Sequence, residues 1–244
     1  MSTPKTILAF AAHPDDVELS CSGTLIKHAK AGHQCIVVDL TRGELGSRGN
    51  ADLRDEEAAR AAKIMGLAQR HNLRMADGFF DVNEENIIKI IKEIRRFTPD
   101  IVLANAPEDR HPDHGKGAEL VKRAFFYSGL RKIETSYNEE PQQAFRPNAL
   151  YHYIQDRYLQ PDFVVNIEEY WEQKLESIAA YSSQFFTGKE TQKSDDPQTP
   201  ISSKDFMDFI EGRAGQFGRS IQVKYAEGFV AARTPGVSYL TDLG

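Results

Sequence analysis

Short apolar runs alternate along the chain with longer segments in which apolar residues recur every three or four positions. The apolar runs predict buried β-strands at residues 7–10, 36–38, 101–103 and 163–165. The periodic segments predict helices at residues 17–30, 53–65, 84–97, 115–127 and 168–182. Strands that are apolar along their whole length and alternate with helices are typical of a mainly parallel sheet covered on both faces. The sequence therefore predicts one α/β domain over residues 1–244, a Rossmann-like fold whose ligands bind beyond the carboxyl ends of the strands.

One segment interrupts this alternation. Residues 187–204 contain Gly188, Pro197 and Pro200 among many polar side chains, and they offer little apolar surface to bury. The segment is longer than a minimal connection between two elements. We interpret it as a mobile surface loop, and the alternative is a lid over an active site.

Composition and charge narrow the class of protein. Hydrophobic residues make up 40% of the chain and charged residues 27%, as in an ordinary globular protein. The net charge of −6 argues against binding to nucleic acid or to an anionic membrane surface. The first apolar run is too short for a signal peptide, and no run approaches the roughly 20 apolar residues that cross a bilayer. With only Cys21 and Cys35, the chain has neither a disulfide framework nor a thiolate metal site, and we expect a cytoplasmic protein.

Two similar stretches carry the chemistry. Residues 12–16 read Ala-His-Pro-Asp-Asp and residues 110–114 read Arg-His-Pro-Asp-His, each after a predicted strand and before a predicted helix. Proline favours an extended residue before it and is well suited to the first position of a helix. The acidic residues that follow would then lie in the first helical turn, where the helix dipole stabilises a carboxylate. A single copy would indicate only a capped helix, but two copies after buried strands indicate a site.

If both strands are central in one parallel sheet, the two stretches converge at its carboxyl edge. His13, Asp16 and His114 then form a plausible set of metal ligands, with two imidazoles and one carboxylate. Such a set binds Zn²⁺ with a position left open for water, as in catalytic zinc sites. Because the set has no sulfur ligand, iron, cobalt and manganese remain open as alternatives.

At these residues the chain resembles the LmbE-like (PIG-L) family of N-acetylglucosamine deacetylases. The resemblance rests on the two His-Pro-Asp motifs and extends to residues 41–49, 54–57 and 225–229. Within the family, the chain is most similar to the deacetylases of bacillithiol biosynthesis, which act on N-acetyl-glucosaminyl-L-malate. The resemblance implies a zinc-dependent N-deacetylase and a small N-acetylated amino sugar as substrate. It also implies a homo-oligomer, either a trimer or a hexamer.

The resemblance also implies roles for single residues. It assigns His13, Asp16 and His114 to the metal, Asp15 to the catalytic base, and His111 to a histidine that is charge-paired with Asp113. It places Arg54 in the substrate pocket. The chain departs from the family at Phe206, where some members bring an aromatic hydroxyl near the reacting carbonyl.

Amide hydrolysis gives these residues physical tasks. Asp15 would accept the proton of the attacking water and could return it to the departing amine. His111, kept protonated by Asp113, would stabilise the developing oxyanion or donate a proton. Arg54 and Arg110 are candidates for binding a carboxylate of the substrate, because a guanidinium can bind it through two nitrogens. The alternative for each arginine is a surface ion pair.

Three functions remain open on the sequence. The first is deacetylation of a glucosaminyl-malate, and the second is deacetylation of another N-acetylglucosamine compound, such as a chitooligosaccharide. The third is a metal-binding or sugar-binding module without turnover. Asp15 argues against this third reading, because a binding module has no need of a base beside its ligands.

Overall fold

Parallel strands form the centre of the main sheet in the computed structural model, which describes residues 3–186 and 197–243. The strand order is β3-β2-β1-β4-β7-β9-β8, in which β9 runs antiparallel to both of its neighbours. These strands are β1 (Thr6–Ala11), β2 (Gln34–Asp39), β3 (Gln69–Asn72), β4 (Ile101–Ala104), β7 (Ala149–Tyr153), β8 (Phe163–Asn166) and β9 (Ala226–Ala231). A separate hairpin pairs β5 (Ser136–Tyr137) with β6 (Glu140–Pro141).

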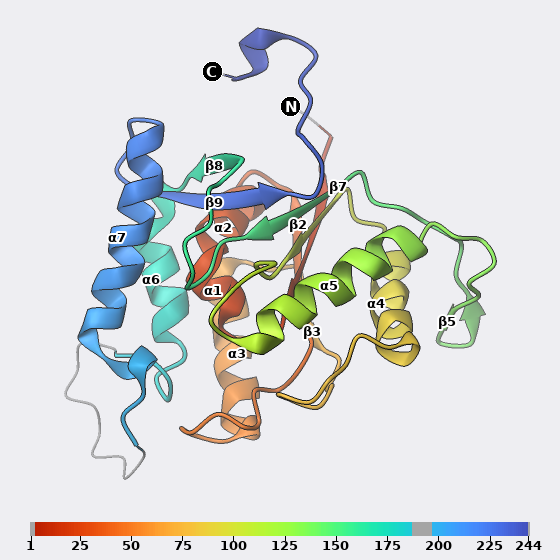
Figure 1. The fold of residues 1–244 in the computed structure, drawn as a ribbon, viewed down its shortest axis with the longest axis horizontal. Coiled ribbons are helices and arrows are strands. Elements are labelled where there is room, and N and C mark those ends of the chain that lie inside the picture. The colour runs from red at the N-terminus through yellow and green to blue at the C-terminus, as the bar shows by residue number, and fades with distance from the viewer. Residues whose placement is uncertain (1–2, 187–196, 244) are drawn as a thin grey trace.

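Helices cover both faces of the sheet (Figure 1). They are α1 (Asp16–Ser20), α2 (Ser22–Lys30), α3 (Ala51–Met65), α4 (Glu84–Phe97), α5 (Pro112–Tyr127), α6 (Trp171–Ala179) and α7 (Lys204–Ser220). Short 3-10 turns form η1 (Glu168–Tyr170), η2 (Pro200–Ser202) and η3 (Leu240–Leu243). Within the described residues, none of the helices combines the length and the apolar character that crossing a membrane requires.

The alternation of side chains along β1 explains the two layers. Leu8 and Phe10 point to one face, where they pack with the apolar residues of α4 and α5. Ile7 and Ala9 point to the other face and pack with residues of α1, α2 and α3. Because both faces are buried, the strand is apolar at every position from Ile7 to Ala11, as in other parallel sheets. The predicted α/β fold with a mainly parallel sheet is confirmed.

The order of the strands places a crevice beside β1. The chain runs from β1 through β2 to β3 on one side and then returns to β4 on the other side of β1. Such a switch point opens a crevice at the carboxyl ends of the two central strands. Both His-Pro-Asp stretches follow these ends.

The structure departs from the predicted elements in several places. The helix predicted at 17–30 is interrupted at Cys21, whose φ of −144° is not helical, so that α1 and α2 are separate. Strands β3, β7 and β9 and helix α7 were not predicted. Of the loop predicted at 187–204, residues 187–196 lie outside the described residues. The remainder includes η2, and Lys204 already belongs to α7.

Candidate metal centre and active site

The first motif makes a tight turn between β1 and α1. The Asp16 carboxylate folds back and accepts the backbone N–H of His13 through Oδ2 at 2.9 Å. The helix begins at Asp16, so the prediction for Asp16 is confirmed, but Pro14 is not its first residue. Asp15 instead precedes the helix with φ 117° and ψ −24°, in the left-handed region that side chains other than glycine rarely adopt. Backbone strain of this kind is often kept at functional sites.

The second motif forms the helix start that the sequence predicts. His111 is the N-cap of α5 and Pro112 is its first residue. The ring of His111 accepts the backbone N–H of Asp113 through Nδ1 at 3.2 Å. The expected pairing of the His111 ring with the Asp113 carboxylate is not what the structure shows. That carboxylate accepts the N–H of Gly78 at 2.8 Å and lies 3.4 Å from Nε2 of His13.

The pKa of His111 follows from this arrangement. Burial lowers the pKa of the ring, and the neighbouring His13 and His114 lower it further. Asp113 opposes the shift with a smaller effect. Asp113 therefore offsets only part of the lowering of the His111 pKa, and it does so without the direct contact that the sequence led us to expect. The capping bond to Nδ1 leaves the proton of the neutral ring on Nε2.

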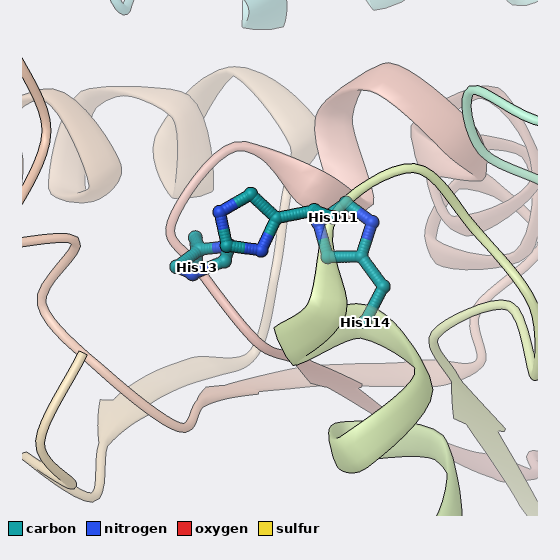
Figure 2. Close-up of side chains that lie close together, drawn as sticks. All are labelled: His13, His111 and His114. Atoms are coloured by element: carbon teal, nitrogen blue, oxygen red, sulfur yellow. The ribbon is translucent and has the colours of Figure 1, made fainter. Parts of the chain in front are cut away.

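The predicted ligands lie together at the carboxyl ends of β1 and β4. Asp16 places Oδ1 3.0 Å from Nε2 of His114 and Oδ2 3.7 Å from Nδ1 of His13. His111 joins them, with its ring centroid 4.6 Å from that of His13 and 5.1 Å from that of His114. Figure 2 shows the three imidazoles gathered at the N-terminal end of α5. Their nearest ring nitrogens lie within 4.8 Å of one another, so that these histidines could hold a metal ion.

Buried carboxylates orient two of the histidines. Asp109 lies 2.5 Å from Nδ1 of His114 through Oδ2, and its Oδ1 accepts the backbone N–H of Arg157 at 2.6 Å. Asp77 lies 3.0 Å from Nε2 of His13. Each contact occupies one ring nitrogen and leaves the other directed toward Asp16. Carboxylates behind ligating histidines are a common feature of metal sites, because they fix the tautomer.

Two side-chain amides hold Asp16. Asn105 donates from Nδ2 to Oδ2 of Asp16 at 2.9 Å, and Gln155 donates from Nε2 to Oδ1 at 3.0 Å. Nδ2 of Asn105 also donates a hydrogen bond to Oε1 of Gln155 at 3.0 Å. Sequence reasoning missed both of these residues, together with Asp77 and Asp109. A polar residue that directly follows a buried strand was the available signal for Asn105.

The guanidinium of Arg54 lies beside Asp15 and is engaged by contacts within the protein. Its Nη1 is 3.2 Å from Oδ2 of Asp15 and 3.2 Å from the carbonyl oxygen of Pro14, and both side chains are buried. Burial raises the pKa of Asp15 to about 7, although the charge of Arg54 opposes the shift. The loop at Gly43 allows this position of Arg54, because a Cβ there would lie 2.9 Å from Nη1. Arg110 is more exposed, and its Nε lies 3.0 Å from Asp156.

A cleft of about 400 Å³ opens over these residues. Its floor holds His13, Asp15, Asp16, His111 and His114. One wall is apolar, with the side chains of Leu19, Ile201, Phe206, Phe209 and Ile210. Within this wall the ring of Phe206 stacks at 6.0 Å on that of Phe209, so no hydroxyl is offered at that position. A polar floor with one apolar wall suits a sugar-sized ligand.

The chain is similar to known proteins over much of its length. Residues 8–125 match the model of the PIG-L family, described as GlcNAc-PI de-N-acetylase. A diacetylchitobiose deacetylase of Thermococcus kodakarensis is 28% identical over 191 residues, covering 74% of this chain and 70% of that protein. A probable N-acetyl-alpha-D-glucosaminyl L-malate deacetylase 2 of Bacillus anthracis is 27% identical over 201 residues, covering 77% and 84%.

A solved structure extends the similarity to nearly the whole chain. A conserved protein of Thermus thermophilus is 31% identical, with a TM-score of 0.84 over 97% of this chain and 98% of that one. The matched family region covers both His-Pro-Asp motifs. On these similarities, the chain is a member of the PIG-L (LmbE-like) family of deacetylases.

Proposed function

We propose that this protein is a zinc-dependent hydrolase that removes the acetyl group from N-acetylglucosaminyl-malate. The observation that carries the proposal is the position of Asp15, a buried carboxylate next to Asp16 and on the floor of the cleft. The similarity to the Bacillus anthracis protein supports the malate conjugate as substrate.

The donor set fits a metal ion of the zinc type. We assign Nδ1 of His13, the carboxylate of Asp16 and Nε2 of His114 as ligands, because outside contacts occupy the opposite ring nitrogens. Nitrogen and oxygen donors with no sulfur suit a catalytic zinc site. When bound, zinc would acidify a water molecule and polarise the acetyl carbonyl.

The protein's own groups would handle the protons. Asp15 accepts the proton of the attacking water and transfers it to the departing amine nitrogen. Arg54 keeps the Asp15 carboxylate oriented through its contact at 3.2 Å. His111 can donate from Nε2 to the oxyanion that forms on the acetyl group, because its Nδ1 is already an acceptor. His111 would then donate the hydrogen bond to the oxyanion that an aromatic hydroxyl at the position of Phe206 would otherwise donate.

A second substrate class has support from the apolar wall. Phe206, Phe209 and Ile201 present a surface against which a second sugar ring could stack. The similarity to the diacetylchitobiose deacetylase agrees with this alternative. A chitooligosaccharide is therefore the competing substrate.

The test is release of free amine from three substrates by the zinc-loaded protein. These are N-acetylglucosaminyl-malate, N,N'-diacetylchitobiose and N-acetylglucosamine. We expect the highest kcat/KM with the malate conjugate. Preference for diacetylchitobiose would favour the second substrate class, and absence of amine from all three would refute a deacetylase.

The role of Asp15 is tested with Asp15→Asn. We expect the variant to keep its zinc, measured by elemental analysis, and to lose activity by a factor of about 100 or more, as for a general base. Asp52→Asn is the control, because Asp52 has a 90% exposed side chain. Near-normal turnover by zinc-loaded Asp15→Asn would remove Asp15 from this role.

A further inference from the structure

A third arginine lines the cleft and has no place in the mechanism above. Arg213 extends from α7, and its Nη1 donates to the carbonyl oxygen of Gln155. Its Nη2 donates to the carbonyl oxygen of Leu19 at 2.7 Å. Within the part of the chain that the structure describes, these are its only hydrogen bonds. Because a guanidinium has five N–H groups, Nε–H and one N–H on each Nη remain available.

The charge of Arg213 distinguishes it from the other arginines of the cleft. Arg54 faces Asp15 and Arg110 faces Asp156, so that a carboxylate balances each of those charges. Arg213 forms no ion pair with a carboxylate among residues 3–186 and 197–241. Burial lowers the pKa of Arg213 to about 10, and Glu227, Asp156 and Asp109 oppose this shift only from a distance. A partly buried charge without a counter-ion is costly, and an incoming anion would offset that cost.

The surroundings of Arg213 place it next to the ligand cluster. The residue whose carbonyl it binds, Gln155, also contacts the Asp16 carboxylate at 3.0 Å. On the other side, the guanidinium lies 5.5 Å from the ring centroid of Phe209 in the apolar wall. A substrate whose acetamide lies over the histidines could therefore reach Arg213 with the group attached to its sugar.

We propose that Arg213 binds a carboxylate of the group attached to the sugar and so determines specificity for acidic substrates. The inference rests on the proposed function for the position of the acetamide. The ligand class is a carboxylate-bearing glycoside of N-acetylglucosamine. A bidentate, charge-assisted contact would use N–H groups that the protein leaves available. Neutral glycosides would bind without this contact.

The experiment measures binding and not turnover. Calorimetry gives the Kd for N-acetylglucosaminyl-malate and for the methyl glycoside of N-acetylglucosamine, measured throughout in the zinc-loaded Asp15→Asn background so that the ligands are not hydrolysed during the titration. For Arg213→Gln we expect a Kd for the malate conjugate that is about 10- to 100-fold weaker, as for a lost hydrogen bond to a charged group. The Kd for the methyl glycoside should change less than about threefold. Arg213→Lys keeps the charge but loses the two-point contact. Its Kd for the malate conjugate should lie between the Kd of the protein with Arg213 and that of Arg213→Gln.

Arg95→Gln is the matched control. Arg95 also binds main-chain carbonyl oxygens, those of Ser128, Leu130 and Ile133, but it lies away from the cleft. We expect it to lower the melting temperature and to leave the ratio of the two Kd values unchanged.

If Arg213→Gln weakened the binding of both ligands by the same factor, Arg213 would only connect α7 to the domain. An unchanged Kd for both ligands would also overturn the proposal. A wild-type protein that binds the malate conjugate but releases no acetate would refute the proposed function and leave the role of Arg213 intact.

Discussion

Replacing Asp109 with asparagine exchanges one carboxylate oxygen for an amide nitrogen behind His114. In the structure Oδ2 of Asp109 lies 2.5 Å from Nδ1 of His114, which leaves Nε2 of the ring directed at Asp16. If the new amide nitrogen faces His114, Nδ1 must accept, and the proton moves to Nε2, the atom that would bind the metal. If the amide turns over, its nitrogen faces the backbone N–H of Arg157, 2.6 Å from Oδ1 in the structure. Both orientations are therefore unfavourable.

The size of the effect follows from the lost contact. A hydrogen bond to a charged group contributes about 1.5–3 kcal/mol, which is a factor of roughly 10 to 100 in an equilibrium constant. Loss of a partner behind a ligand typically weakens metal binding by about the same factor. We therefore expect Asp109→Asn to bind zinc about 10- to 100-fold more weakly than the wild-type protein.

The assay is competition for zinc against a fluorescent chelator at neutral pH. Asp100→Asn is the matched control, because Asp100 also accepts a backbone N–H, that of Thr6 at 2.9 Å, and also contacts a basic side chain, Lys5. It lies at the opposite end of the strands and should leave zinc affinity unchanged. A zinc affinity of Asp109→Asn equal to that of the wild type would refute the assignment of Nε2 of His114 as a ligand atom.

Two further predictions concern stability. Removing zinc with a chelator should lower the melting temperature, since a ligand at about 100 times its Kd adds about 2.7 kcal/mol to folding; calorimetry with and without added zinc measures this, and identical curves would contradict the site. Glu227→Gln should lower the free energy of unfolding by about 3–5 kcal/mol, because it leaves the buried Lys174 ammonium, 2.8 Å from Glu227, without its counter-ion. Urea unfolding measures the loss, with the exposed Glu172→Gln as control, and equal midpoints for the two variants would argue against this ion pair.

Helix α4 and the two central strands could be predicted because their sequences are locally consistent. The isoleucines of α4 recur at helical spacing, and β4 and residues 7–11 of β1 are apolar because both faces of the sheet are covered. Helix α7 escaped prediction because it contains three glycines. At Gly218 a Cβ would lie 2.6 Å from the carbonyl oxygen of Val223, so close packing excludes a better helix former there.

That the proposed ligands lie together could be predicted from the sequence, but their surroundings could not. His13, Asp16 and His114 stand in recognisable motifs, and the structure brings them together. Asp77 and Gln155 lie in segments without a motif, and only the folded sheet brings them to the site. The contact between the Asp113 carboxylate and the His13 ring depends on the exact backbone turn of the first motif. The conformational preferences of proline do not specify that turn. The expected homo-oligomer stays a prediction.

The order in which the site can assemble follows from the topology. The backbone N–H of Ala12 donates a hydrogen bond to Oδ1 of Asn105 at 2.9 Å, although the two residues are 93 positions apart. The ligands on the two motifs therefore meet only after the intervening crossover has folded and β4 has paired with β1. Closing so long a segment costs chain entropy that a single ion cannot easily repay in the unfolded state. Unlike a zinc finger, whose closely spaced ligands let the metal direct folding, this protein should form its sheet first and capture the cation afterwards.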